Sequence, residues 1–151
     1  AYRRQRQMCI RDRAAFEPVP GRGTRIARGA LVVIDEAYNA NPDSVRAAMN
    51  VLAVEPGPRT FVMGDMGEIG EGALEAHREA GLYARALGLD ALYACGPLSR
   101  HAAEAFGEGA RWFESRDALI EALKGLRGTA TVKASHYMGF SAVVRALTDG
   151  E

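Results

Sequence analysis

The chain alternates short apolar runs with longer segments in which apolar residues recur every three or four positions. The run 30–35, AlaLeuValValIleAsp, is apolar on both faces, which is typical of a buried parallel strand. AsnProAsp at 41–43 then supplies an N-cap candidate and a proline suited to the first helical position, so a helix is predicted to follow. ProGly at 56–57 is expected to end this helix. Its predicted buried positions are Val45, Ala48, Met49 and Leu52.

The same alternation continues to the end of the chain. Further strands are predicted at 60–63, 90–95, 111–113 and 129–133, and further helices at 74–87, 97–106, 115–126 and 140–147. Positions 74, 80, 84 and 87 are expected to form the apolar face of the second helix. Five strand–helix units predict an α/β fold: a doubly wound, mainly parallel, Rossmann-like sheet of about five to six strands with helices on both faces. Residues 24–28 are predicted to pair with the first strand as an edge hairpin.

Composition excludes several classes of protein. The 151 residues are 48% apolar and 25% charged, close to an average soluble domain. The apolar runs are far shorter than the ~20 residues that span a bilayer. Cys9 and Cys95 belong to no CxxC pair, so neither a zinc site nor a disulfide framework is indicated. We therefore expect a cytoplasmic monomer that binds neither membranes nor nucleic acid.

The N-terminal segment differs from the rest of the chain. Residues 1–13 carry five arginines and one aspartate, so the remainder of this neutral chain is net acidic. A basic arm can contact nucleic acid, but this one has no apolar period, no caps and no glycine or proline punctuation. We interpret 1–13 as a foreign or disordered segment, 14–29 as a linker and edge strand, and 30–151 as the main domain.

Polar residues gather in the turns that follow the predicted strands, at 35–41, 64–70, 96–99 and 133–139. In a parallel sheet these turns meet at the carboxyl edge, where ligands bind. The first helix begins there, and its N-terminus favours an anion such as phosphate or carboxylate. Asp35 is placed to bind a ribose hydroxyl, and Asn39 and Asn41 could hold a peptide-like ligand through their amides. Alternatively, Asp35 and Asn41 are turn and cap formers.

Other polar residues also have both a functional and a structural interpretation. His77 is either a ligand contact or a partly buried helix histidine with one hydrogen bond. Ser135 stands beside His136 but lacks a GxSxG elbow, so a nucleophilic pair is not supported. Asp65 and Glu68 could bind magnesium, although a glycine-flanked acidic turn is usually solvated.

Four stretches together resemble one known family. AspGluAlaTyrAsnAlaAsnPro at 35–42 is similar to the D-D-x-Y-N-A-N-P motif of bacterial Mur ligases. GlyAspMetGlyGluIleGly at 64–70 resembles the family's G-D-M-x-E-L-G, and His77 follows at the family's spacing. ValLysAlaSerHis at 132–136 resembles V-K-G-S-R. ProGlyArg at 20–22 resembles the P-x-G-R segment that leads into the family's C-terminal domain.

The resemblance covers about residues 18–148 and implies that 30–151 form the C-terminal domain of an ATP-dependent amide ligase. The matching branch of the family adds D-alanyl-D-alanine to UDP-N-acetylmuramoyl-tripeptide in peptidoglycan precursor synthesis. In that family the N-terminal domain holds the UDP-sugar, and the central domain carries the P-loop and Mg²⁺. The C-terminal domain closes to bring in the dipeptide. ATP phosphorylates the tripeptide carboxyl, and the dipeptide amine attacks the acyl phosphate.

The resemblance also implies roles for individual residues, and no catalytic residue or metal ligand is among them. ATP would be held with the help of Arg22, Asp35, Asn39 and Asn41. The dipeptide side would be faced or flanked by Tyr38, Asn39, Asn41, Lys133, Ser135 and His136.

Two departures from the family pattern bear on activity. Ala134 and His136 stand where the family has glycine and arginine, which removes a permanent charge and puts a backbone conformation in question. The 151 residues also contain no GxxxxGK[ST], so a P-loop is missing and we expect a fragment that is inactive alone. A competing hypothesis is a stand-alone nucleotide or amino-acid binding module without catalysis. A structural or regulatory domain would instead be expected to carry an exposed apolar patch on these turns.

Overall fold

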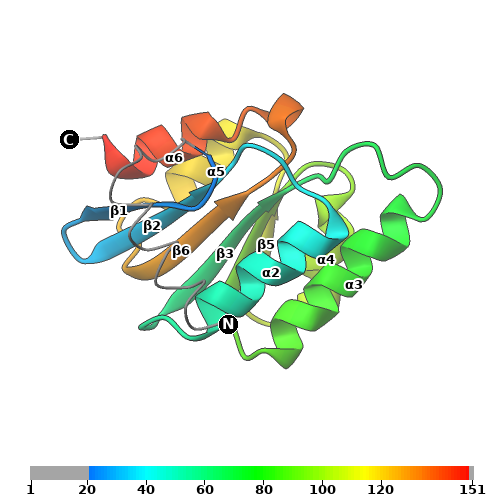
Figure 1. The fold of residues 1–151 in the computed structure, drawn as a ribbon, viewed down its shortest axis with the longest axis horizontal. Coiled ribbons are helices and arrows are strands. Elements are labelled where there is room, and N and C mark those ends of the chain that lie inside the picture. Colours follow the sequence, from blue (N-terminus) through cyan, green and yellow to red (C-terminus); the bar gives the residue numbers. More distant parts are fainter. Residues whose placement is uncertain (1–20, 150–151) are drawn as a thin grey trace, which may run out of the picture.

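The structure is a computed structural model that describes residues 21–149. A six-stranded sheet forms its middle layer (Figure 1). The segment predicted to be foreign or disordered, 1–13, and the first part of the predicted linker, 14–20, lie outside the described residues. The strand order is β1-β2-β6-β3-β4-β5. The strands are β1 (Thr24–Arg28), β2 (Leu31–Glu36), β3 (Arg59–Gly64), β4 (Ala91–Cys95), β5 (Ala110–Phe113) and β6 (Gly128–Lys133).

The pairing confirms the predicted fold class. β1 runs antiparallel to β2 as the expected edge hairpin, and all other neighbours are parallel. One face of the sheet is covered by α2 (Pro42–Ala53), α3 (Ala73–Ala86) and α4 (Ser99–Phe106), and the other by α5 (Arg116–Ala122) and α6 (Ser141–Thr148) (Figure 1). Within residues 21–149, every helix is too short or too polar to cross a bilayer.

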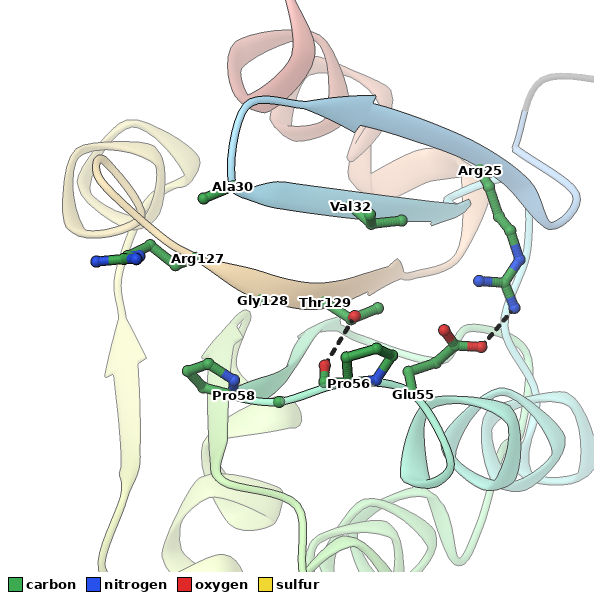
Figure 2. A pocket seen from close by; sticks show the side chains of 10 residues that line it. Arg25, Ala30, Val32, Glu55, Pro56, Pro58, Arg127, Gly128 and Thr129 are labelled. Carbon is green, nitrogen blue, oxygen red and sulfur yellow. Dashed lines mark hydrogen bonds and ion pairs between the residues drawn. The ribbon is translucent and has the colours of Figure 1, made fainter.

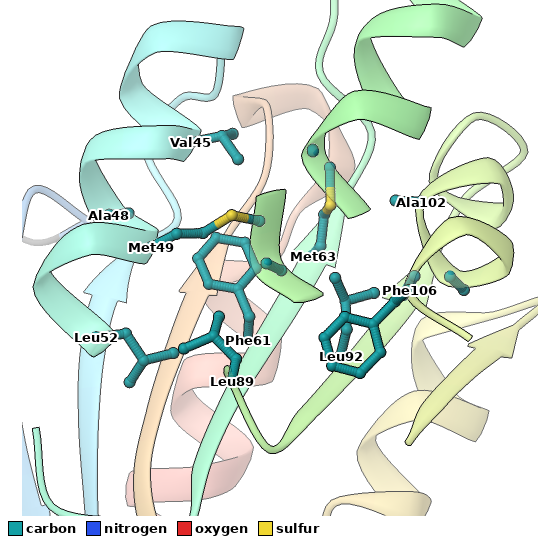
Figure 3. Close-up of a cluster of buried hydrophobic side chains, with 14 of the residues drawn as sticks. Val45, Ala48, Met49, Leu52, Phe61, Met63, Leu89, Leu92, Ala102 and Phe106 are labelled. Atoms are coloured by element: carbon teal, nitrogen blue, oxygen red, sulfur yellow. The ribbon is translucent and has the colours of Figure 1, made fainter. Parts of the chain in front are cut away.

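Two apolar clusters, one on each face, bury the sheet because successive strand residues point to opposite sides. Phe61 and Met63 of β3 pack under α2, α3 and α4, whereas Val62 between them joins the cluster under α5 and α6. Figure 3 shows the Phe61 ring between Met49 and Leu52 of α2 on one side and Leu89 and Leu92 on the other. The predicted core face of α2 is confirmed: Val45, Ala48, Met49 and Leu52 are all buried.

Two details of the helices differ from the sequence prediction. Leu74 was expected in the core but is 49% exposed, because His77 takes the buried position on that face of α3. The helix predicted over 115–126 ends at Ala122. Gly125 follows with φ +81°, a left-handed conformation that stops an α-helix.

A glycine allows α3 and α4 to pack closely. A Cβ placed on Gly81 would lie 2.1 Å from the backbone oxygen of Ala102. Because that atom belongs to the α4 backbone, it cannot move aside as a side chain would. The sequence position therefore requires glycine for packing, although it lies in the interior of a helix.

Substitution of Thr131 is expected to stabilise the protein. Its Oγ1 is the buried side-chain oxygen that has no hydrogen-bond partner within the described part of the chain. Thr131→Val keeps the shape and removes the unpaired hydroxyl, so it should raise the free energy of unfolding by about 1 kcal/mol in urea denaturation.

Thr129 on the same strand offers a matched control. Its Oγ1 donates to the Pro56 oxygen at 3.0 Å, so Thr129→Val should lower stability by about 1 kcal/mol. Equal losses from the two substitutions would contradict the assignment.

Candidate functional site

The turns singled out in the sequence meet at one edge of the sheet, as predicted. β6 lies between β2 and β3, with Glu36 and Met63 both opposite Lys133 in the parallel registers. The turns after these three strands are therefore direct neighbours. The turn after β4 lies beside them on the same edge.

Asp35 is a structural anchor of the first turn. It is buried, and its two carboxylate oxygens accept hydrogen bonds from the backbone of Gly21 (2.9 Å) and Ala37 (3.0 Å). The Tyr38 amide also donates to the Gly21 oxygen at 3.0 Å. Gly21 has φ +83°, and an added Cβ would sit 3.0 Å from the Tyr38 Cβ and backbone nitrogen. Asp35 thus acts as the turn former considered from the sequence, and it brings Arg22 next to Tyr38.

Arg22, Tyr38 and His136 form an exposed stack. The Arg22 guanidinium carbon lies 4.0 Å from the centre of the Tyr38 ring, a cation–π distance. The His136 ring centre lies 5.6 Å from the same ring, tilted by 51°. Tyr38 is 45% exposed. The stack presents two tilted aromatic rings and a cation to the solvent.

The two asparagines have different structural roles. Asn41 caps α2: its Oδ1 accepts from the Ser44 amide at 2.8 Å, and the Asn41 amide donates to the Ser44 Oγ at 3.0 Å. Asn39 is exposed, and only its backbone oxygen is engaged, by the Lys133 ammonium at 2.8 Å. Within residues 21–149 the Asn39 side chain makes no hydrogen bond, so its amide is available to a ligand.

Lys133 joins the first turn to the end of β6. Only 4% of it is exposed, and its Nζ lies 3.6 Å from the Glu36 carboxylate. Burial lowers the pKa of the Lys133 ammonium, and the nearby Glu36 carboxylate opposes that shift. Sequence reasoning missed Glu36. The feature of the sequence that could have indicated Glu36 is its position at the end of the strand, next to Asp35.

Ser135 lies beneath the surface. Its Oγ accepts a hydrogen bond from the Gly67 amide, and its own amide donates to the Asp65 oxygen at 3.1 Å. The preceding residue, Ala134, is fully buried. Its φ is not positive, because Glu68 is the one non-glycine residue with positive φ among 21–149. The backbone at Ala134 therefore does not need the conformational freedom of glycine.

A shallow depression of about 250 Å³ collects most of the predicted residues. Asp35, Ser135 and His136 are not part of its lining; the first two are buried and His136 stacks nearby on Tyr38. Its lining consists of Gly21, Arg22, Glu36, Tyr38, Asn39, Asn41, Ser44 and Lys133. Two amides, a guanidinium and an ammonium suit an anionic ligand with hydrogen-bonding groups better than a metal ion.

Asp65 is not solvated, which corrects the expectation for an acidic turn. It is 2% exposed, and its carboxylate accepts from the amides of Leu98 (3.2 Å) and Ser99 (2.7 Å) and from the Ser99 hydroxyl (2.8 Å). These bonds start α4 at Ser99, two residues later than the predicted 97. In the described residues, no group of three His, Cys, Asp or Glu side chains gathers as a metal site.

A larger depression of about 380 Å³ opens at the opposite edge of the sheet (Figure 2). Its Arg25 and Glu55 form an ion pair at 2.7 Å, and the Thr129 hydroxyl donates to the Pro56 oxygen. All predicted site residues lie at the other ends of the strands. The candidate site is therefore the depression at the carboxyl edge.

Both the sequence and the fold of the chain are similar to those of known proteins. Residues 21–146 match the family described as Mur ligase, glutamate ligase domain. The chain is 38% identical over 143 residues to the UDP-N-acetylmuramoyl-tripeptide--D-alanyl-D-alanine ligase of Escherichia coli K12, covering 90% of this chain and 31% of that ligase. It thus spans about a third of this relative's length.

Solved structures show the same fold. A crystal structure of MurF from Acinetobacter baumannii superposes with a TM-score of 0.79 at 26% identity, over 88% of this chain and 31% of that one. MurF from Thermotoga maritima in complex with ADP gives a TM-score of 0.78 at 24% identity, over 93% and 33% of the two chains.

Substitutions of the two asparagines should separate folding from ligand contact. Asn41→Ala removes a helix cap and should lower the free energy of unfolding by about 1 kcal/mol, whereas Asn41→Asp keeps the acceptor and should cost little. Asn39→Ala should change stability by less than about 0.5 kcal/mol. Urea denaturation of the three variants measures this, and a large loss from Asn39→Ala would contradict the assignment.

Proposed function

Because the chain belongs to the Mur ligase family, as its glutamate ligase domain, we propose that it acts as the C-terminal domain of an ATP-dependent ligase. The ligase joins D-alanyl-D-alanine to UDP-N-acetylmuramoyl-tripeptide, the reaction named for the Escherichia coli relative. The observation that carries this proposal is the gathering of Arg22, Tyr38, Asn39, Asn41 and Lys133 around one depression at the carboxyl edge.

The chemistry of amide formation defines what this edge has to do. ATP supplies the phosphoryl group that converts the tripeptide carboxylate into an acyl phosphate, which the dipeptide amine then attacks with loss of phosphate. Arg22 is exposed and stacked on Tyr38, so its positive charge is held where it can meet phosphate oxygens. The Asn39 amide can donate to and accept from a nucleotide or a peptide bond.

The exposed residues suit a surface that closes over ligands. In our proposal, Arg22 and Asn39 face ATP, while the Tyr38 and His136 rings face the dipeptide. Asp35, Lys133 and Ser135 act from below by holding the turns, and Asn41 both caps α2 and faces the ligands. Closure of such a surface excludes water from the acyl phosphate, which water would otherwise hydrolyse.

Mg²⁺ and the P-loop belong, in this proposal, to the central domain of a longer ligase. The depression is lined by amides and cations with one carboxylate, Glu36, which already lies 3.6 Å from the Lys133 ammonium. Such a set of donors does not fit a hard divalent cation. We further propose that the ligase works as a monomer in the cytoplasm, where ATP and nucleotide-linked precursors are available.

The decisive experiment compares this chain with a version extended upstream through its genomic reading frame. Phosphate release is measured with ATP, Mg²⁺, UDP-N-acetylmuramoyl-tripeptide and D-alanyl-D-alanine. We expect release that requires both acceptor substrates in the extended protein and none from the 151 residues alone. No activity in either protein, together with nucleotide binding by this chain alone, would favour the binding module without catalysis.

Asn39→Ala in the extended ligase should lower kcat/KM by about tenfold, which corresponds to about 1.4 kcal/mol of transition-state stabilisation. Asn50→Ala is the matched control, because Asn50 is an exposed asparagine of α2, away from the depression, whose side-chain oxygen accepts from the Tyr83 hydroxyl. Equal kinetics for the wild type and Asn39→Ala would remove Asn39 from the site.

A further inference from the structure

A chain of hydrogen bonds links three turns of the carboxyl edge, and it begins at a histidine outside the depression. The Met66 amide donates to His77 Nε2 at 2.9 Å, and the next amide, of Gly67, donates to the Ser135 hydroxyl. The Ser135 hydroxyl in turn lies 3.5 Å from the Ala40 oxygen of the first turn. His77 and Ala40 are thus connected across three separate elements of the sheet edge.

The bonding of His77 determines which of its nitrogens carries the proton. A backbone amide can only donate, so Nε2 must accept from Met66 and is unprotonated. Nδ1 therefore carries the hydrogen and donates to the Ala73 oxygen, 2.6 Å away. The ring is fully buried. His77 is consequently neutral in this arrangement, with a defined tautomer.

The position of Ser135 depends on the same turn. Its hydroxyl accepts from the Gly67 amide, so its single proton is directed to another acceptor. Among residues 21–149, the acceptor within reach is the Ala40 oxygen, 3.5 Å away. Its amide bonds the Asp65 oxygen. If the second turn moved, Ser135 would lose both bonds. The backbone that carries Asn39 and Asn41 would then lose a support.

We propose that His77 is a positioning residue of the ligand site, which in its neutral Nδ1-protonated form holds the second turn and, through Ser135, the first turn. It touches no ligand. The inference rests on the proposed function only for the identity of the ligand that the first turn meets.

Protonation would break this arrangement. A proton on Nε2 would face the donating Met66 amide, and the bond would be lost. Burial lowers the pKa of His77, and the nearby His101 of α4 lowers it further. The hydrogen bond from His77 to the Ala73 oxygen opposes this shift, as does the negative charge of Asp65. In the described part of the chain, Asp65 and His101 are the titratable groups that act on His77. Because the folded pKa lies below the ordinary value of 6.5, the unfolded state binds more protons below about pH 6.5, so stability falls as the pH drops from there.

The first test is a pH titration of the isotope-labelled full chain by NMR, without ligand. The imidazole ¹⁵N shifts of His77 should show the Nδ1–H tautomer at neutral pH. On acidification, the amide signals of Met66, Gly67, Ala40 and Asn41 should change with one common midpoint below pH 6.5. Titration of His77 with unchanged signals at Ala40 and Asn41, or the opposite tautomer, would overturn the proposal.

Variants provide the second test. His77→Phe removes the acceptor and should speed hydrogen exchange of the Met66 amide by about tenfold or more while shifting the Ala40 and Asn41 signals. His77→Gln offers an amide oxygen to Met66 and should restore much of the protection. His101→Gln is the control and should leave the first turn unchanged. A purely structural histidine would lower stability in His77→Phe without moving the first-turn signals, and that result would overturn the proposal.

The extended ligase then separates this inference from the proposed function. His77→Gln should retain more kcat/KM than His77→Phe, and the deficit of His77→Phe should grow as the pH rises, because only the wild type gains the neutral acceptor. An inactive wild type would refute the proposed function while leaving the NMR result intact. An active wild type with pH-independent variant ratios would refute the positioning role.

Discussion

The insertion of β6 between β2 and β3 is the constraint on which the rest of the structure depends. β6 is the last strand in the chain, yet it pairs in parallel register with the first and second parallel strands. Its central place brings Lys133 and Ser135 under turns that lie about 70 to 95 residues earlier in the sequence. Without that long-range pairing, the first and second turns would have no common support.

The polar residues of the edge divide into those that hold the turns and those that face solvent. Asp35, Asp65, His77 and Ser135 are buried, and each bonds backbone groups of a turn. Such groups are costly to bury unless they are hydrogen-bonded, so their partners define one arrangement of the turns. Arg22, Tyr38 and Asn39 remain exposed on the supported surface. A motif rich in polar residues therefore combines structural and ligand-facing positions.

The departures from the family motif are accommodated differently. Ala134 is fully buried beside Gly64. A Cβ added to Gly64 would lie 2.6 Å from the Ala134 Cβ. A methyl group at 134 thus fits because residue 64 has no side chain. His136 is exposed and stacks on Tyr38, so it contributes a flat ring where a permanent positive charge would otherwise stand.

The sequence by itself determined the elements, the α/β class and the cap at Asn41, because these depend on local periodicity and on turn chemistry. The ends of the strands also indicated Asn39 and Asn41 of the depression, whereas Arg22, Tyr38 and Lys133 were identified through the resemblance to the family motifs. Only the tertiary structure decided which of them are buried. Asp65 was expected in solvent, but it is buried and caps α4. Leu74 was expected in the core, but it is exposed and His77 is the buried residue on that face of α3. Glu36 was missed altogether. Asp65 and Glu36 depend on partners distant in the sequence, Ser99 and Lys133, which spacing along one chain cannot specify.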